Sequence, residues 1–434
     1  MQRRIRLILL YLLVVLLAAA LLWQMIASTA ARTVSIPDGR EITIQQLSFG
    51  TNHEFVIGNI WYRMLASVTP RSWKGKLPVR FHTQKTTKPI LMVCGEWILP
   101  GTNQPAPMLL VKEAGSQQTY KTFGNWIAGQ GKNRLVMTWP IDNFPRRAKS
   151  VEFDICEWRT SRWDAVAHFK LPNPARPHID RWQREPFPAT RAANGMEFTI
   201  ANFSEAKFVT TPWLPVFARN EVGTGFAGIF MVNKEGRPQS NWKVDRMTVR
   251  DPTGNEVASR RLTPSVRVAD YLMFGLEGPV WSSESNWKLT ADFVRGSDFP
   301  TNELCTIKGV PVPVSGVSTQ ILADAEANGI SLIGVELQRM GRGINFYRIN
   351  EDVAVEALLP EILPDTAVTL AEVRDDSGRT LLFEPSHRGI EEFHYGIQLY
   401  PDSKTLDLTF AMQKRVRVEW TVGLQRLERA KPKR

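Results

Sequence analysis

Residues 7–31 form an apolar stretch without a single charged side chain, and this stretch limits where the chain can fold more than any other feature. About 20 apolar helical residues cross the ~30 Å hydrocarbon core of a bilayer. A helix is also the only single segment that satisfies its own backbone there. Arg3, Arg4 and Arg6 precede the stretch. Because positive charge favours the cytoplasmic side, we expect residues 1–6 in the cytoplasm, a signal-anchor helix over 7–31, and an extracytoplasmic remainder.

A cleaved signal peptide is the alternative interpretation of this stretch. Ser28, Thr29 and Ala30 supply small residues at a spacing that suits a signal peptidase. The apolar run is longer than the roughly 7–15 residues of a signal-peptide core, which favours a retained anchor. Both alternatives export the rest of the chain, to the periplasm or the cell exterior. No later stretch is long and apolar enough to span a membrane, so the sequence predicts a single-pass protein held by membrane lipid.

Short alternations of apolar and polar residues dominate the chain beyond the apolar stretch. Residues 151–155, Val-Glu-Phe-Asp-Ile, alternate, a tight turn is expected at 159–162, and residues 163–169 return as a second strand. Such runs, interrupted by Gly, Pro and Asp, are typical of β-strands and hairpins. Long helical periodicity is absent, and short helices are conceivable only at 59–67 and 319–328. The sequence therefore predicts a mainly β protein.

Two proline-rich stretches divide the exported part, and proline favours stiff, extended connectors. We expect them to separate three β-sandwich modules that follow one another along the chain. The predicted segments are module 1 at 33–171, a linker at 172–190, module 2 at 191–308, a linker at 309–317, module 3 at 318–425 and a basic tail at 426–434.

The three predicted modules share a local pattern. Val111-Lys-Glu, Val249-Arg-Asp and Val373-Arg-Asp each end a predicted strand in a base followed by an acid, just before a glycine turn. Gly254 and Gly378 are separated by the same number of residues as Tyr271 and Tyr395. A shared strand order of the immunoglobulin-like sandwich type would explain these spacings.

The net charge of +11 does not indicate a nucleic-acid-binding surface. Much of the excess lies in the three N-terminal arginines and in the basic tail, and the remainder is that of an ordinary protein surface. A DNA-binding domain concentrates its excess in one stripe. We therefore expect no nucleic-acid partner.

The three cysteines show no zinc-binding spacing. Cys94 and Cys156 could form a disulfide outside the cytoplasm, which would leave Cys305 without a disulfide partner. The other interpretation, which we favour, is that each is a small buried side chain within a strand.

No catalytic or cofactor motif in the sequence is convincing. Residues 223–228, Gly-Thr-Gly-Phe-Ala-Gly, match the dinucleotide-binding fingerprint, but residues 229–232 are expected to follow them as a strand rather than a helix, so we expect a glycine-rich hairpin or bulge at 223–228. His387, Glu391 and His394 would share one face of a helix and could bind a metal ion. Gly389 weakens a helix there, and the alternation near Phe393 favours a strand with His394 exposed. These three remain weak metal-site candidates, and we expect no cofactor.

The combination of an anchor, repeated modules and no catalytic cluster predicts a non-enzymatic scaffold of the cell envelope that binds another protein. A carbohydrate-binding or cell-wall glycan-processing protein is the first alternative, because the chain has 14 tryptophans and flat aromatic rings stack on sugars. Exposure of Trp126, Trp213 and Trp281 would distinguish it. A metal-dependent hydrolase is the second alternative.

Overall fold

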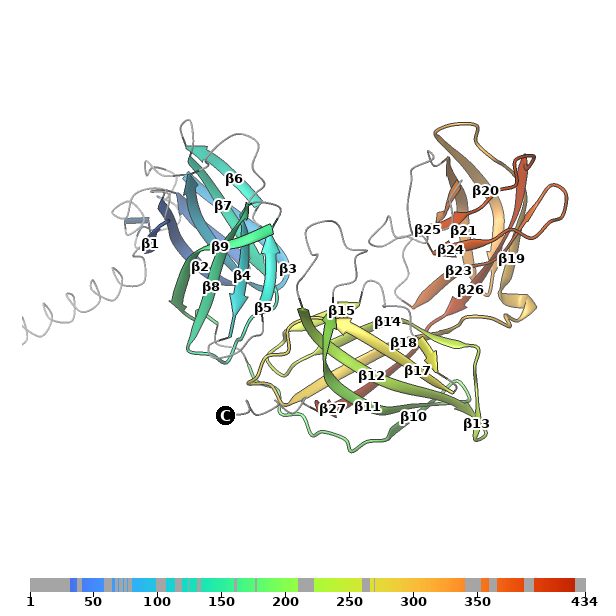
Figure 1. Ribbon diagram of the computed structural model, residues 1–434, viewed down its shortest axis with the longest axis horizontal. Helices are drawn as coiled ribbons and strands as arrows, with labels where there is room; N and C mark the ends of the chain where they lie inside the picture. The colour runs from blue at the N-terminus through green and yellow to red at the C-terminus, as the bar shows by residue number, and fades with distance from the viewer. Residues whose placement is uncertain are drawn as a thin grey trace, which may run out of the picture.

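The computed structural model of the protein shows a mainly β architecture of antiparallel sheets, which confirms the predicted fold class at this level (Figure 1). The structure describes residues 32–36, 41–57, 65–66, 69, 73, 76, 80–98, 107–113, 119–123, 125–130, 134–159, 162–175, 178–209, 222–259, 266–268, 270–339, 353–358, 365–385 and 394–425. The predicted anchor at 7–31 lies outside these residues. Among the residues that are described, no helix has the length and apolar character needed to span a bilayer.

Module 1 consists of two antiparallel sheets that face each other. The first sheet has the order β1-β2-β3-β7-β6, with β1 at Arg32–Ser35, β2 at Glu41–Ile57, β3 at Arg80–Ile98, β7 at Arg134–Ile141 and β6 at Asn125–Gln130. The second has the order β5-β4-β8-β9, with β5 at Thr119–Phe123, β4 at Met108–Lys112, β8 at Ser150–Arg159 and β9 at Arg162–Pro172. Alternate residues of both sheets, such as Val93 and Phe153, form one buried core between them.

Module 2 has the same layout. Its first sheet has the order β10-β11-β12-β17-β16, with β10 at Ala189–Ala193, β11 at Met196–Val209, β12 at Val222–Lys234, β17 at Tyr271–Glu277 and β16 at Val266–Val268, and the short β13 at Arg237–Pro238 pairs with β12. Its second sheet has the order β15-β14-β18-β27, with β15 at Glu256–Ser259, β14 at Trp242–Arg250, β18 at Asn286–Arg295 and β27 at Val416–Gly423. An aromatic core that includes Phe230, Phe293 and Trp420 lies between the two sheets.

Module 3 repeats this layout with one strand fewer in its smaller sheet. Its larger sheet has the order β20-β21-β22-β25-β24, with β20 at Val317–Ala327, β21 at Ile330–Arg339, β22 at Val353–Leu358, β25 at His394–Ile397 and β24 at Phe383–Pro385. Its smaller sheet has the order β19-β26-β23, with β19 at Leu304–Pro311, β26 at Thr405–Lys414 and β23 at Thr366–Asp375. The strand β20 occupies the segment in which a short helix at 319–328 was conceivable, so that idea was wrong.

Modules 2 and 3 exchange one strand each, and the sequence-based boundaries do not show this. In module 1, β8 turns back directly into β9 beside it. In module 2, by contrast, the chain leaves β18, passes through the short 3₁₀ turn η2 at Thr301–Glu303, and enters β19, which pairs with β26 of module 3. The chain then returns through β27, which pairs with β18. β19 and β27 therefore each occupy the position of β9, but in the other module.

The exchange has a simple physical cause. Only Arg415 separates β26 from β27, and a β-hairpin needs a loop of at least two residues. β27 therefore cannot fold back beside β26 and continues into module 2. The strand pairing corrects the predicted end of module 3 at 425, because residues 416–423 belong to module 2. It also corrects the predicted linker at 309–317, because β19 extends to Pro311.

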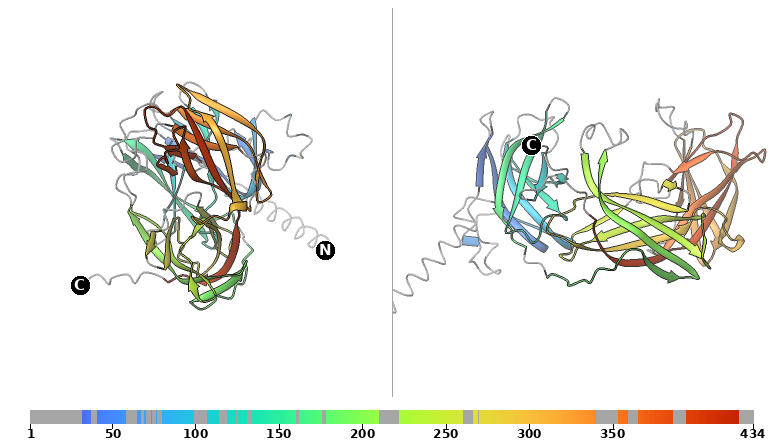
Figure 2. Two further views of the ribbon diagram at one scale, coloured as in Figure 1. Left: turned by 90° about the vertical axis from the view of Figure 1, so that its right-hand side faces the viewer. Right: turned by 60° about the horizontal axis from the view of Figure 1, so that its bottom comes forward.

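The described part of the first proline-rich stretch lies along module 2 as an ordered segment. Glu185 N donates to Thr421 O at 2.7 Å, and Thr421 N donates to Glu185 Oε1 at 2.9 Å. Asn286 Nδ2 also donates to Trp182 O at 3.1 Å. The segment thus covers the free edge of β27 and places module 1 beside module 2, with module 3 on the far side (Figures 1 and 2).

Candidate functional site: the joint between modules 1 and 2

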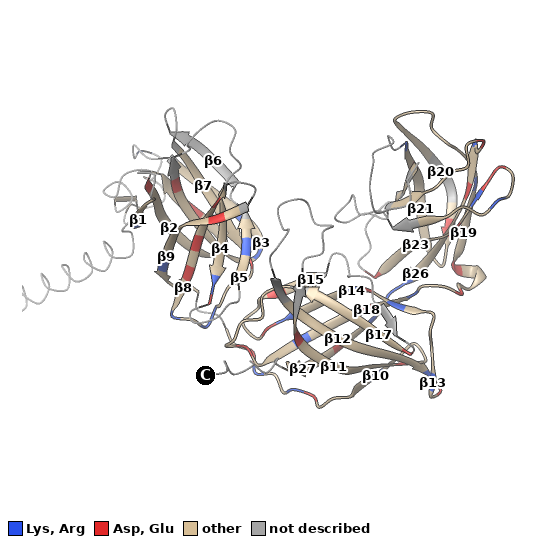
Figure 3. Ribbon diagram, viewed as in Figure 1, with Lys and Arg blue, Asp and Glu red and all other residues tan. Residues whose placement is uncertain are grey.

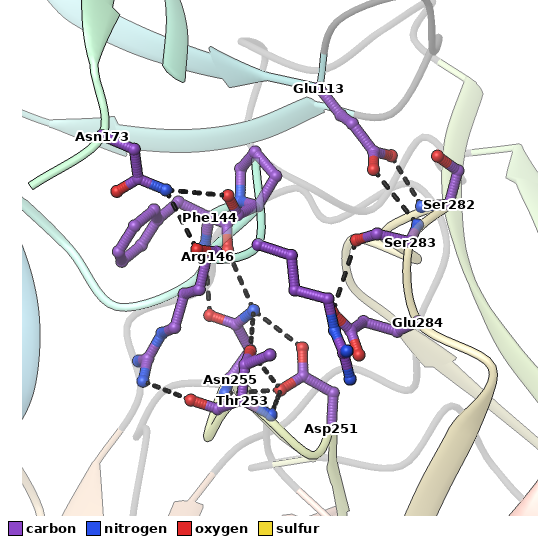
Figure 4. A network of polar contacts seen from close by, with 12 residues as sticks. Glu113, Phe144, Arg146, Asn173, Asp251, Thr253, Asn255, Ser282, Ser283 and Glu284 are labelled. Carbon is purple, nitrogen blue, oxygen red and sulfur yellow. Dashed lines mark hydrogen bonds and ion pairs between the residues drawn. The ribbon is translucent and has the colours of Figure 1, made fainter. Parts of the chain in front are cut away.

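A network of polar contacts joins modules 1 and 2 (Figure 4). Its centre is a tight turn that follows β14. Asp251 Oδ1 accepts hydrogen bonds from Thr253 N at 2.8 Å and Asn255 N at 3.0 Å, and the backbone of Asp251 pairs with that of Asn255. Asp251 is completely buried, and these donors replace the water that its carboxylate has lost.

Asn255 links this turn of module 2 to the backbone of module 1. Its Nδ2 donates to Phe144 O at 2.9 Å, and Phe144 N donates to its Oδ1 at 3.3 Å. The same Nδ2 donates to Asp251 Oδ2 at 2.7 Å, which holds the amide in this orientation. Asn143 Nδ2 adds a bond to Glu256 O at 2.8 Å. The side-chain amide of Asn255 thus makes with the backbone of Phe144 the pair of hydrogen bonds that a neighbouring strand would make.

Arg146 of module 1 enters the joint as a buried cation. Its Nη1 donates to Thr253 O at 2.9 Å, and its guanidinium lies over the rings of Phe49 and Phe144 at 5.3 and 5.4 Å. Burial lowers the pKa of Arg146, and the negative charges of Asp251 and Asp142 oppose that shift. Asn173 Nδ2, also in module 1, donates to the carbonyl oxygens of Pro145, Arg146 and Ala148. These bonds hold the backbone of the turn that carries Arg146.

A second set of contacts runs in the opposite direction, from module 1 to module 2. Glu113, which follows β4 as Asp251 follows β14, accepts hydrogen bonds from Ser282 N at 2.6 Å and Ser283 N at 3.2 Å. Between the two sets, Arg147 Nε donates to Glu284 Oε1 at 2.8 Å. Glu284 is 1% exposed, and burial raises its pKa while Arg147 opposes the increase.

The joint is therefore reciprocal. In each module, the turn after the β4 or β14 strand contacts the turn before the β8 or β18 strand of the other module. Pro145 to Ala148 and Trp281 to Glu284 are equivalent turns, each closed by a backbone bond of 3.1 Å. Reciprocal contacts of this kind are the mark of an isologous, two-fold interface. Modules 1 and 2 thus dock through the same end of their sandwiches.

Modules 2 and 3 are also joined by buried polar contacts, which involve different residues from those of the first joint. Arg415 Nε donates to Asp245 Oδ2 of module 2 at 2.6 Å, and Arg415 N donates to Asp365 O of module 3 at 2.7 Å. The side chain of Arg415 is only 1% exposed. Two covalent crossings and these polar contacts together resist rotation of one module against the other.

The structure does not test the candidate metal site. His387 and Glu391 lie outside the described residues, and His394 is described only as the first residue of β25. Among the described residues, no cluster of three or more His, Cys, Asp or Glu side chains could hold a metal ion.

The strand expected at residues 229–232 is present as part of β12. The glycine fingerprint at 223–228 lies in the same strand and pairs regularly with β11, so the predicted hairpin or bulge was wrong. A Cβ at Gly228 would lie 2.4 Å from two ring atoms of Phe274. The small size of this glycine therefore serves sheet packing.

Among the other sequence candidates, Trp281 and two of the three cysteines are buried, whereas Cys305 is half-buried. Trp281 is completely buried, whereas the side chains of Trp126 and Trp213 lie outside the described part. Cys94 on β3 and Cys156 on β8 are both buried thiols. Burial, followed by the charge of Asp154, raises the pKa of Cys156 to about 12.

Sequence reasoning identified the Asp251 turn as a hairpin but did not identify the joint. The motif around Asp251 gave a signal only for local turn geometry. The partners of Asn255 and Glu113 are more than one hundred residues away, and no local pattern marks them.

Comparisons with known proteins leave the fold as the only basis for classification. None of the protein-family models, curated proteins or solved structures compared with the chain gives a significant match. The protein is a mainly β protein of several antiparallel sheets arranged in sandwich-like pairs.

Proposed function

We propose that the protein is a non-enzymatic, membrane-anchored scaffold of the cell envelope that presents three immunoglobulin-like modules in a fixed arrangement to another protein. The reciprocal joint between modules 1 and 2 is the observation that supports this proposal most directly. It uses buried charged and amide groups whose geometry suits a fixed orientation better than a swinging one. The strand exchange between modules 2 and 3 supports the same conclusion.

Loss of the joint provides the test of the scaffold. Asn255→Ala removes the two hydrogen bonds to the backbone of Phe144. It leaves Phe144 N and O without these partners, which should cost about 1–3 kcal/mol of stability. Spin labels on modules 1 and 3 of the full chain should give a narrow distance distribution in the wild type and a broad one in Asn255→Ala. Asn233→Ala, on β12 away from the joint, is the control.

Function is tested by recovering the partner from native membranes with the tagged full chain. A protein that co-purifies with the wild type and Asn233→Ala, but at least about tenfold less with Asn255→Ala, is the expected result. Turnover of a peptide or glycan by the purified chain would contradict the non-enzymatic role.

Anchoring rests on the charge-free stretch at 7–31 and needs its own test. The full chain should remain in the membrane fraction after extraction at high pH. In cells with a permeabilised envelope but an intact cytoplasmic membrane, added protease should digest modules 1 to 3. Replacement of Leu16 and Leu17 by Arg should release the chain from the membrane. Recovery of the wild type as a cytosolic protein would contradict the proposal.

A glycan partner is supported by one described tryptophan. Trp73 is 64% exposed, and Lys76 Nζ lies 5.8 Å from its ring centroid. An open indole face with a nearby cation suits a sugar that carries acidic groups. Titration of the full chain with cell-wall glycan fragments should give binding that Trp73→Ala abolishes; equal binding by both chains would remove this role from Trp73.

A further inference from the structure

The end of module 3 that lies farthest from module 2 repeats the docking elements of the joint. Asp375 is the last residue of β23, one position earlier relative to its strand than Asp251, which directly follows β14. Its Oδ1 accepts hydrogen bonds from Ser377 N at 3.0 Å and Arg379 N at 2.9 Å, as Asp251 Oδ1 does from Thr253 N and Asn255 N. The turn from Tyr400 to Ser403 precedes β26 and is closed by a backbone bond of 3.1 Å, the same value as in the two turns of the joint. Both docking turns are therefore present in module 3.

The first residue of the Tyr400 turn is exposed in module 3, whereas its counterpart in module 2 is buried; Asp375 is buried, as Asp251 is. Trp281 of module 2 is 0% exposed, and Tyr400 at the equivalent position is 46% exposed. Leu382 is 66% exposed beside the Asp375 turn, and Val314 is 96% exposed in the loop whose Val312 N donates to Lys404 O. Three large apolar side chains are thus exposed at this end of the sandwich. We call this surface, defined by Val314, Leu382, Tyr400 and the Asp375 turn, the distal face.

The distal face also carries both signs of charge (Figure 3). Arg379 bonds Asp375 and Asp402 and lies 4.2 Å from the ring centroid of Tyr400. Asp376 and Lys404 are exposed beside them. In a two-fold dimer, a residue away from the axis contacts a different residue of the second copy. A surface that carries both signs of charge can therefore place its cations beside the anions of the second copy.

We propose that the distal face binds the distal face of a second copy of the chain about a two-fold axis. The reciprocal contact between modules 1 and 2 carries this inference, because it shows that this end of the sandwich can dock onto its own kind. In that joint, Arg147 and Glu284 meet between the two reciprocal sets of contacts. Asp402 and Ser403 occupy the equivalent positions in module 3 and therefore lie near the axis.

The mass of the full chain in detergent micelles, measured by light scattering over a range of concentrations, tests the proposal. The protein part should approach twice 49.2 kDa as concentration rises. Tyr400→Asp and Leu382→Asp should each weaken association about tenfold or more, because a charge replaces an apolar contact at the centre of the interface. Tyr271→Asp is the matched control, since Tyr271 is 44% exposed on module 2 and should leave the dimer intact.

A cross-link locates the axis independently. Asp402→Cys should form a disulfide between two chains on mild oxidation, whereas Ser297→Cys, in the exposed connection after β18, should not. A chain that stays monomeric at all concentrations overturns the proposal. So does a dimer that Tyr400→Asp and Leu382→Asp leave unchanged, because association would then occur through the apolar stretch or another surface.

Discussion

The side-chain amide of Gln413 pairs with the backbone of Arg295 in both directions. Arg295 N donates to Gln413 Oε1 at 2.8 Å, and Gln413 Nε2 donates to Arg295 O at 3.0 Å. Gln413 lies near the end of β26 and Arg295 at the end of β18, the two points where the chain crosses between modules 2 and 3. The pair therefore holds both crossings together.

Removal of this amide should destabilise the junction. Gln413 is 3% exposed, so Gln413→Ala leaves both backbone groups of Arg295 without their partners at a cost of about 1–3 kcal/mol. Urea denaturation of the full chain should show a lower midpoint for this variant. Gln338→Ala, at an exposed position on β21, should leave the midpoint unchanged. Equal midpoints for Gln413→Ala and the wild type would mean that the pair contributes nothing.

Trp420 provides a test of the strand exchange. It is completely buried in module 2, 5.4 Å from Phe230 and 6.4 Å from Phe293 between ring centroids. Trp420→Ala should cost about 3–5 kcal/mol, because a large cavity replaces the indole. Hydrogen exchange should then accelerate in β12 and β18 of module 2 before it does in β23 of module 3. The reverse order would place Trp420 in module 3, where the sequence-based boundary put it.

His53 should make the stability of module 1 depend on pH. Its side chain is 0% exposed, its Nδ1 lies 3.2 Å from Ser48 Oγ, and burial lowers its pKa below the ordinary 6.5. Because the folded pKa is depressed, the stabilising contribution is complete above pH 6.5 and is lost as pH falls through the folded value. Thermal unfolding between pH 7.5 and pH 5 should show this loss.

His53→Gln should flatten that part of the pH profile, because it removes the titrating group while it keeps a polar partner for Ser48. His178→Gln is the control, since the side chain of His178 is 92% exposed. If the wild type and His53→Gln lose stability in parallel over this range, another group is responsible.

Gly228 should be intolerant of even a methyl group. A Cβ there would lie 2.4 Å from two Phe274 ring atoms and 2.9 Å from Asn202 O. Gly228→Ala should therefore destabilise module 2 by about 1–3 kcal/mol through overpacking. At Gly296 the nearest atom to a Cβ would be Lys243 Cδ at 3.4 Å, so Gly296→Ala should be tolerated. Chemical denaturation of both variants makes the comparison; equal stability would show that the ring of Phe274 moves aside.

The sequence by itself determined that the described part of the chain is mainly β and where many of its strands run. Apolar residues alternate at a period of two, and this period decides locally which side chains can face a core. The hairpin at 159–162 follows from that pattern, as does the strand over residues 229–232. The matched spacing of Gly254 and Gly378 corresponds to equivalent turns after β14 and β23, both with positive φ.

Only the tertiary structure decided which sheet each strand joins and which turns dock. β27 has the same alternation whether it pairs with β26 or with β18, and the single residue between β26 and β27 settles the choice in favour of β18. Asn255 and Phe144 are far apart in sequence, and their pairing depends on the placement of two whole modules. Strand pairing and module docking are non-local, so the free energy that selects them comes from contacts that a local pattern does not contain.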